Sequence, residues 1–138
     1  MKEFHAKTFS FLQGTLSGRL LISKTPLSFY GDIDVSSGVI INPRHDLYGE
    51  TLSGKILLIP HSSGSTVGPY IIYALSQKGL APRAILTCHA DSLTAIGCII
   101  GNIWYIYDVP ESLLDERYHG IRVEISVRSR EAVIKVNV

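Results

Sequence analysis

The chain has 138 residues, of which 46% are hydrophobic and 18% are charged, and its 13 Lys and Arg nearly balance 12 Asp and Glu. This composition excludes a disordered chain, and the length fits one domain spanning 1–138. The net charge of +1 leaves no basic excess for nucleic-acid binding, so we expect no nucleic-acid partner. The mean hydropathy of +0.22 fits either an ordinary apolar core or apolar surface covered by a partner.

We expect the protein to be cytoplasmic, with no membrane association. No apolar run approaches the roughly 18 residues that cross a bilayer, and the segment from Met1 lacks the apolar core of a signal peptide. The two cysteines, Cys88 and Cys98, form no CxxC pair and have no further thiols to complete a metal site. We therefore expect no metal bound by this chain, and two buried cysteines that act as small hydrophobic residues.

The first forty residues predict short strands separated by turns and one irregular stretch. We expect strands at 3–10 (at a sheet edge), 19–23 and 38–43, a turn flanked by Gly14 and Gly18, and the irregular stretch at 26–34.

A continuous apolar run at 55–60 predicts a strand that is buried on both faces. Apolar residues then recur with the spacing of one helix face over 67–78, and 83–88 is a second buried strand. These three segments predict one βαβ-like unit.

The last third of the chain predicts a short helix, a further strand and a terminal hairpin. Asp91 is expected to cap a helix that runs through Ile96. The other elements are a strand at 103–107, a short helix or turn at 110–116, and an antiparallel hairpin of 121–127 with 132–138, which alternate with period two. The whole pattern indicates a β-rich α/β barrel or sandwich.

The residues most suited to binding or catalysis lie in the loop between the strand at 55–60 and the helix at 67–78. The loop contains His61, Ser62, Ser63, Gly64, Ser65 and Thr66. A helix N-terminus with unpaired N–H groups favours a carboxylate, a phosphate or a developing oxyanion. The same residues are also ordinary loop and cap residues, and the segment is neither a Walker loop nor a G-x-S-x-G elbow.

Pro69 fixes the expected register of this helix. Proline lacks an N–H, so it belongs in the first turn, where donors have no intrahelical partner. With Thr66 as the cap, Pro69 takes the third helical position and loses no bond. This register leaves the Ser65 hydroxyl free for chemistry.

Other polar residues allow alternatives that the sequence leaves open. His61 borders the loop and is a candidate for contacting an anionic substrate, and His45 lies in a polar turn. Asp32 and Asp34 are turn residues or a paired acid and base.

Ordered motifs over residues 16 to 107 resemble the small, swivel-domain subunit of the aconitase X family. They are Pro26-Leu27-Ser28-Phe29, Gly31-Asp32-Ile33-Asp34, Pro43 to Glu50, Leu52-Ser53-Gly54-Lys55, Gly64 to Tyr73, Gly79 to Ile85 and Ala95 to Gly101.

The resemblance implies a swivelling β/β/α barrel-like fold, as in the mobile domain of aconitase. It implies a heterodimer with a large subunit that carries a four-iron iron–sulfur cluster. The implied reaction is dehydration of (R)-5-phosphomevalonate to trans-anhydromevalonate 5-phosphate in the archaeal mevalonate pathway, which leads to isoprenoids. The implied base is Ser65, with Ser63, Gly64, Thr66 and His61 contacting the substrate.

Two positions depart from the family pattern. The stretch His61 to Gly64 lacks the usual basic residue between two glycines, which puts phosphate contact by this loop in doubt, and Pro69 replaces a serine. A related branch dehydrates cis-3-hydroxy-L-proline, but the Thr66-Val67-Gly68 continuation favours the mevalonate branch. A non-catalytic binding domain with the swivel fold is a further alternative.

Overall fold

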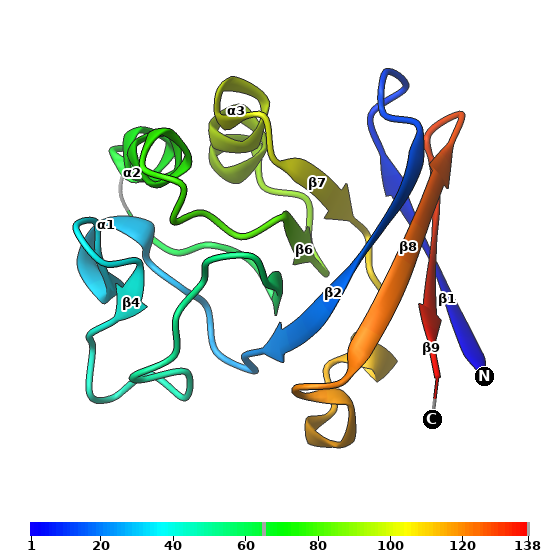
Figure 1. Ribbon diagram of the computed structural model, residues 1–138, viewed down its shortest axis with the longest axis horizontal. Helices are drawn as coiled ribbons and strands as arrows, with labels where there is room; N and C mark the ends of the chain where they lie inside the picture. The colour runs from blue at the N-terminus through cyan, green and yellow to red at the C-terminus, as the bar shows by residue number, and fades with distance from the viewer. Residues whose placement is uncertain (65, 138) are drawn as a thin grey trace.

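The computed structural model describes residues 1–64 and 66–137, which form a closed seven-stranded barrel with helices along one side (Figure 1). The strand order is β1-β7-β6-β5-β2-β8-β9, and β9 pairs with β1 to close the barrel. The barrel strands are β1 Lys2–Thr8, β2 Gly14–Ile22, β5 Ile56–Ile59, β6 Ala84–Thr87, β7 Trp104–Tyr107, β8 Arg122–Arg128 and β9 Glu131–Val136. The other elements are α1 Phe29–Asp32, β3 Ile33–Asp34, β4 Val39–Ile40, α2 Gly68–Gln77, α3 Ser92–Gly101, and the 3₁₀ turns η1 Glu111–Leu113 and η2 Glu116–Tyr118.

The barrel has a parallel half and an antiparallel half. In the parallel half, β2, β5, β6 and β7 run side by side in the same direction. In the antiparallel half, β8 and β9 form a hairpin that joins β2 to β1. Every residue of β5 and β6 is buried, whereas β8 alternates between buried and more exposed positions. The parallel half is therefore covered on its outer side, and the antiparallel half is open to solvent there.

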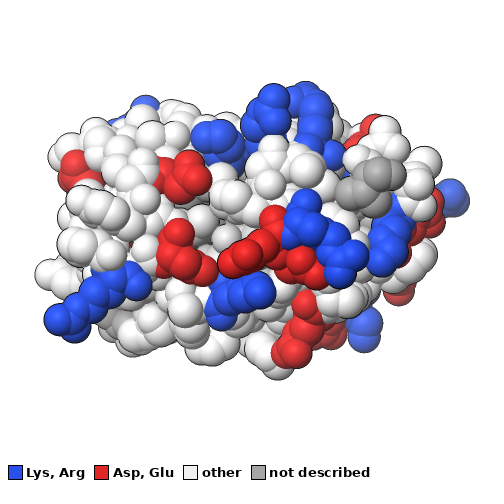
Figure 2. Space-filling model, turned by 90° about the horizontal axis from the view of Figure 1, so that it is seen from below, with Lys and Arg blue, Asp and Glu red and all other residues white. Residues whose placement is uncertain are grey.

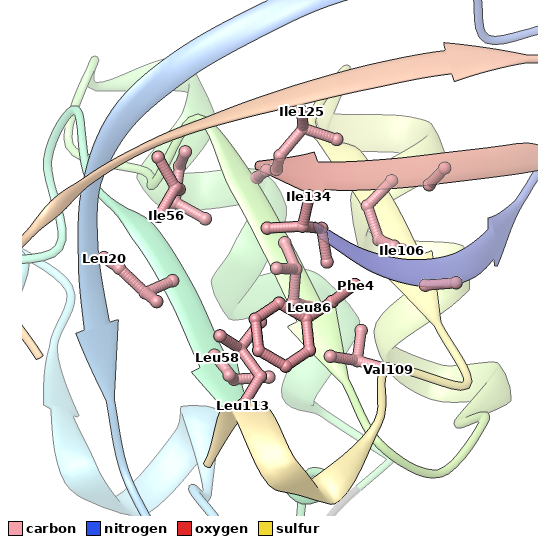
Figure 3. Close-up of a cluster of buried hydrophobic side chains, with 14 of the residues drawn as sticks. Phe4, Leu20, Ile56, Leu58, Leu86, Ile106, Val109, Leu113, Ile125 and Ile134 are labelled. Atoms are coloured by element: carbon pink, nitrogen blue, oxygen red, sulfur yellow. The ribbon is translucent and has the colours of Figure 1, made fainter. Parts of the chain in front are cut away.

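Two apolar cores follow from this arrangement. Leu20, Ile56 and Leu58 point into the barrel, where they meet Ile125 and Ile134 from the antiparallel half (Figure 3). The neighbouring residues of the same parallel strands point outward to the helices. This second core includes Leu57, Ile59 and Ile85 from the strands and Ile72, Leu75 and Cys98 from α2 and α3.

Helices α2 and α3 lie next to each other over the parallel half (Figure 1) and approach closely at a glycine. A Cβ on Gly97 would lie 2.8 Å from the Ile72 Cδ1 atom and 3.1 Å from the Pro69 Cα atom. One turn later, the Ser76 hydroxyl donates to the Gly101 carbonyl oxygen at 2.5 Å. These small residues fix how α2 lies against α3, near both ends of α2.

The central predictions from the sequence are confirmed. The βαβ-like unit is β5–α2–β6, and β5 pairs in parallel with β6 through Leu57 and Ile85. The terminal hairpin is β8–β9, with Ile125 opposite Ile134. The expected strand at 103–107 is β7, and the predicted turn region at 110–116 contains η1. The β-rich α/β barrel is the observed fold class.

Four expectations for individual segments were wrong. The first strand is not at an edge, because β1 pairs with β7 on one side and β9 on the other. The turn expected between Gly14 and Gly18 is part of β2, where a Cβ on Gly18 would lie 3.3 Å from Ile56 Cγ1. Helix α3 continues past Ile96 to Gly101, because Gly97 packs against α2 and does not end the helix. The stretch expected to be irregular contains α1 and β3.

Charged residues of both signs are intermixed on the face shown in Figure 2. This distribution agrees with the net charge of +1, and this face carries no stripe of one sign. Across the described part of the chain, no helix has the length and apolar character needed to span a membrane.

Candidate active site

The loop that follows β5 is anchored on two sides. Pro60 follows the last strand residue, and its carbonyl oxygen accepts hydrogen bonds from the Cys88 and His89 N–H groups at 3.1 and 3.0 Å. On the other side, the Ser63 N–H donates to the Leu27 carbonyl oxygen at 3.0 Å, and Ser62 forms a bridge with Leu27. The start of the loop therefore lies between the segment after β6 and the segment before α1.

Asp91 joins this loop to α3. Its carboxylate accepts hydrogen bonds from the Ser62 N–H at 2.9 Å and from the Ser62 hydroxyl. The same carboxylate caps α3, because it accepts from the N–H groups of Leu93 and Thr94 at 3.1 and 3.3 Å. The predicted capping role is thus confirmed, whereas the link to Ser62, which lies 29 residues earlier, has no local signal in the sequence.

The N-terminal end of α2 differs from the predicted register. The cap is Val67, whose carbonyl oxygen accepts from the Tyr70 and Ile71 N–H groups at 3.0 and 3.3 Å. Gly68 is then the first helical residue and Pro69 the second. Thr66 as the cap is therefore wrong, because a proline loses no hydrogen bond at any of the first helical positions and so does not select one register.

The predicted site residues fall on both sides of one position that the structure does not describe. Ser65, the predicted base, lies outside the described residues. Gly64 has φ +92°, a backbone conformation that residues with a side chain rarely adopt. A Cβ atom on Gly64 would lie 3.6 Å from the Ser28 Oγ atom. His61, Ser63, Gly64 and Thr66 are all exposed. A small pocket at this loop is lined by residues that include Tyr30, Ser62, Ser63, Gly68, Pro69 and Leu93.

His61 has a neighbour that the sequence analysis did not single out. The His61 Nδ1 atom lies 2.7 Å from the Ser62 carbonyl oxygen, and because a carbonyl only accepts, Nδ1 carries the proton. The His61 and His89 rings lie 6.3 Å apart between centroids. The His89 Nε2 atom lies 3.3 Å from Glu111, and both side chains are well exposed. Two imidazoles thus flank the loop, and only folding reveals the pair, because 27 residues separate them along the chain.

His45 belongs to a different cluster at the end of β2. Ser23, His45 and Asp46 have the residue types of a hydrolase triad, but their geometry is structural. The Ser23 hydroxyl is fully buried and donates to the Asp46 carboxylate itself at 2.5 Å. His45 is also buried, and its ring contacts the Leu47 N–H at 3.1 Å and the Pro26 carbonyl oxygen at 3.2 Å. This cluster holds the 43–50 turn against β2, and no substrate reaches its serine.

Asp32 and Asp34 do not form an acid–base pair. Asp32 is buried and accepts from the Ser28 N–H and the Asn42 side-chain amide, each at 2.8 Å. Asp34 is bonded within its own turn, where the Ser37 hydroxyl and the Ser36 N–H lower the pKa of its carboxyl. Each carboxylate serves a local turn.

The cysteines do not fit the cluster that the family resemblance implies. Iron–sulfur clusters are held by thiolates. Burial raises the pKa of the Cys88 thiol to about 11, and burial also raises the pKa of Cys98, so both thiols keep their protons near neutral pH. Within residues 1–64 and 66–137, no three His, Cys, Asp or Glu side chains are grouped to hold a metal ion. The described residues therefore do not fit an iron–sulfur cluster.

Comparison with known proteins identifies the family. Residues 4–136 match the model of the aconitase X swivel domain. The chain belongs to the aconitase X swivel-domain family. The phosphomevalonate dehydratase small subunit of Pyrococcus abyssi is 44% identical over 119 residues, which cover 86% of this chain and 89% of that protein. The corresponding subunit of Methanothrix thermoacetophila is 39% identical over 121 residues, covering 88% and 87%.

The fold agrees with the family assignment. The crystal structure of Thermococcus kodakaraensis aconitase X in its holo-form matches with a TM-score of 0.86 and 33% identity, covering 98% of this chain and 99% of that chain. The swivel fold expected from the family resemblance is therefore confirmed. The two phosphomevalonate dehydratase relatives are named as small subunits, which implies that each of them has a large-subunit partner.

Proposed function

We propose that this chain is the small subunit of a two-subunit hydro-lyase that dehydrates (R)-5-phosphomevalonate to trans-anhydromevalonate 5-phosphate. The observation that carries the proposal is the similarity to phosphomevalonate dehydratase small subunits, at 37–44% identity over most of the chain. The anchored loop between β5 and α2 supports it, because this loop presents exposed polar groups at the N-terminal end of a helix.

In this proposal the Ser65 alkoxide removes the carbon-bound proton, while the hydroxyl group on the neighbouring carbon departs as hydroxide. The hydroxide takes up one proton and Ser65 returns one to solvent, so one water is lost in each turnover. A serine hydroxyl is a weak base, so its alkoxide needs stabilisation by nearby N–H groups and by the positive end of a helix dipole. The α2 N-terminus begins at Gly68, three residues after Ser65. Gly64, Ser63, Thr66 and His61 are the proposed contacts to the substrate.

The partner completes the site. Tyr30, Val67 and Tyr70 are exposed around the loop, with 62%, 37% and 70% of their surface accessible, and we propose that the large subunit covers them. We assign the four-iron cluster to that subunit, because this chain has only two cysteines and its described residues bring no three potential ligands together. We also expect the complex to act in the cytoplasm and to need neither nucleic acid nor membrane.

The test is reconstitution with the large subunit, followed by assays on phosphomevalonate and on cis-3-hydroxy-L-proline. We expect water loss from phosphomevalonate only when both subunits are present. Dehydration of cis-3-hydroxy-L-proline without dehydration of phosphomevalonate would assign the protein to the related branch of the family. A stable complex that dehydrates neither compound would leave a non-catalytic binding domain as the better description.

A further inference from the structure

We propose that Asp91 is a positioning residue for the reaction, which holds the start of the active-site loop in place through Ser62. This inference rests on the proposed function, because it assigns Asp91 a role in presenting the base at Ser65. Asp91 itself lies at the start of α3 and is not proposed to touch the substrate.

The two oxygens of the Asp91 carboxylate face different partners. Oδ1 accepts from the Leu93 and Thr94 N–H groups and so serves the helix. Oδ2 accepts from the N–H and the hydroxyl of Ser62, and also from the Thr94 hydroxyl at 3.0 Å. Capping of α3 needs only the first oxygen, so the second is available to hold the loop.

These contacts require an ionised carboxylate. Burial raises the pKa of Asp91, but the hydrogen bonds from Ser62 and Thr94 outweigh it and lower the pKa below its ordinary value. An asparagine in this position would keep one acceptor oxygen and direct an NH₂ group at N–H or O–H donors. It would therefore satisfy either the helix or the loop, and not both.

The backbone of Asp91 is held in turn by a hydrogen bond to a side chain of the barrel. Its N–H donates to the Tyr105 hydroxyl oxygen at 3.0 Å, and that hydroxyl lies 2.7 Å from the Thr87 Oγ1 atom. Burial raises the pKa of Tyr105 to about 12, so the hydroxyl stays protonated. Thr87 and Tyr105 belong to β6 and β7, and hence the anchor of the loop continues into the parallel half of the barrel.

The consequence is a defined position for the loop relative to the partner. Ser62 precedes Ser65 by three residues, so loss of the Ser62–Asp91 contacts lets the segment that carries the base shift. A misplacement of about 1 Å can lower a reaction rate by roughly 100-fold without abolishing binding. We therefore expect kcat to fall and KM to stay nearly constant when the anchor is removed.

The experiment compares two hydroxyls that bind the same carboxylate oxygen. Ser62→Ala removes the hydroxyl contact on the loop side and keeps the contact from the residue 62 N–H, and Thr94→Val removes the hydroxyl contact on the helix side. In the reconstituted complex we expect Ser62→Ala to lower kcat by about 10- to 100-fold with KM within about twofold, and Thr94→Val to lower kcat by less than about threefold. Equal kcat values for the two variants would overturn the inference.

Two further measurements keep the test decisive. Hydrogen exchange of the complex, followed by mass spectrometry, should show faster exchange over 61–66 in Ser62→Ala and unchanged exchange there in Thr94→Val. This readout needs no turnover, so it tests the anchor even if the complex dehydrates no phosphomevalonate. In addition, Asp91→Ala combined with Ser62→Ala should lower kcat no further than Asp91→Ala alone, since Asp91→Ala already removes the carboxylate that the Ser62 hydroxyl contacts. A double variant whose kcat loss is the product of the two single losses would contradict the proposal.

Discussion

The two halves of the barrel differ in how many of their faces are buried. The parallel half is buried on both faces, and its strands carry unbroken apolar runs such as Ile56–Ile59. The antiparallel half is covered on one face only, and β8 shows this as an alternation of buried and exposed residues. The parallel half also carries the proposed site, because the loops after β5 and β6 meet there, at Pro60 and His89. Double burial thus gives these loops a rigid base on which polar groups are held.

The first prediction tests this contrast by core truncation. Leu57→Ala removes a side chain with no exposed surface from the outer face of β5, where it packs under the helices, so we expect the free energy of unfolding to fall by about 3 kcal/mol. Val133→Ala, on the outer face of β9, should cost about 1 kcal/mol or less. Urea denaturation followed by circular dichroism measures both. Equal losses would show that the two halves are covered alike.

The second prediction concerns the contact between α2 and α3. In Gly97→Ala the new methyl group would lie within 3.1 Å of Ile72 and Pro69, so we expect a loss of about 2 kcal/mol despite the better helix propensity of alanine. Gly31→Ala is the matched control, because its Cβ would meet only Ser28 Oγ at an ordinary 3.6 Å. Thermal unfolding of the two variants separates overpacking from a general effect of the added methyl group.

The third prediction concerns His61, one of the two imidazoles beside the loop. His61→Ala should raise the KM for phosphomevalonate about fivefold with little change in kcat, because the exposed ring is a proposed contact to the substrate anion. His5→Ala, on the exposed side of β1, is the control. Steady-state kinetics of the complex measures both. An unchanged KM in His61→Ala would remove this residue from the site.

The smallest expected effect is a pH dependence of stability at Asp91. The pKa of Asp91 is lower in the folded chain than its ordinary value of 3.8, so its contribution is present above that pH and is lost as the pH falls through the folded value. The difference in unfolding free energy between the wild type and Asp91→Asn should therefore shrink as the pH falls below about 4. Urea titrations at neutral and acidic pH measure it, and a constant difference would show that the carboxylate charge is irrelevant.

Apolar patterns predicted the parts of the fold that depend on burial. The buried runs that form β5 and β6 and the alternation in β8 and β9 are local properties of the sequence. The end of α3 was missed because Gly97 resembles a helix stop until its packing partner Ile72 is known. Closure of the barrel, which removes the edge at β1, likewise depends on strands from opposite ends of the chain.

The candidate site was predictable in its position and not in its connections. A polar, glycine-containing segment after a buried strand marks the loop, and the family resemblance adds Ser65. The bond between Ser62 and Asp91 joins residues that are 29 positions apart, and nothing local distinguishes this aspartate from an ordinary helix cap. The roles of Ser65, Gly64, Ser63, Thr66 and His61 stay predictions until they are tested.

The most direct test of the account is Ser65→Ala in the reconstituted complex, with Ser63→Ala as the comparison. We expect both variants to assemble with the large subunit. Ser65→Ala should lower kcat for phosphomevalonate dehydration by about 1,000-fold, as removal of a general base does, and Ser63→Ala should have a much smaller effect. Turnover by Ser65→Ala at the wild-type rate would contradict the assignment of this loop as the source of the base.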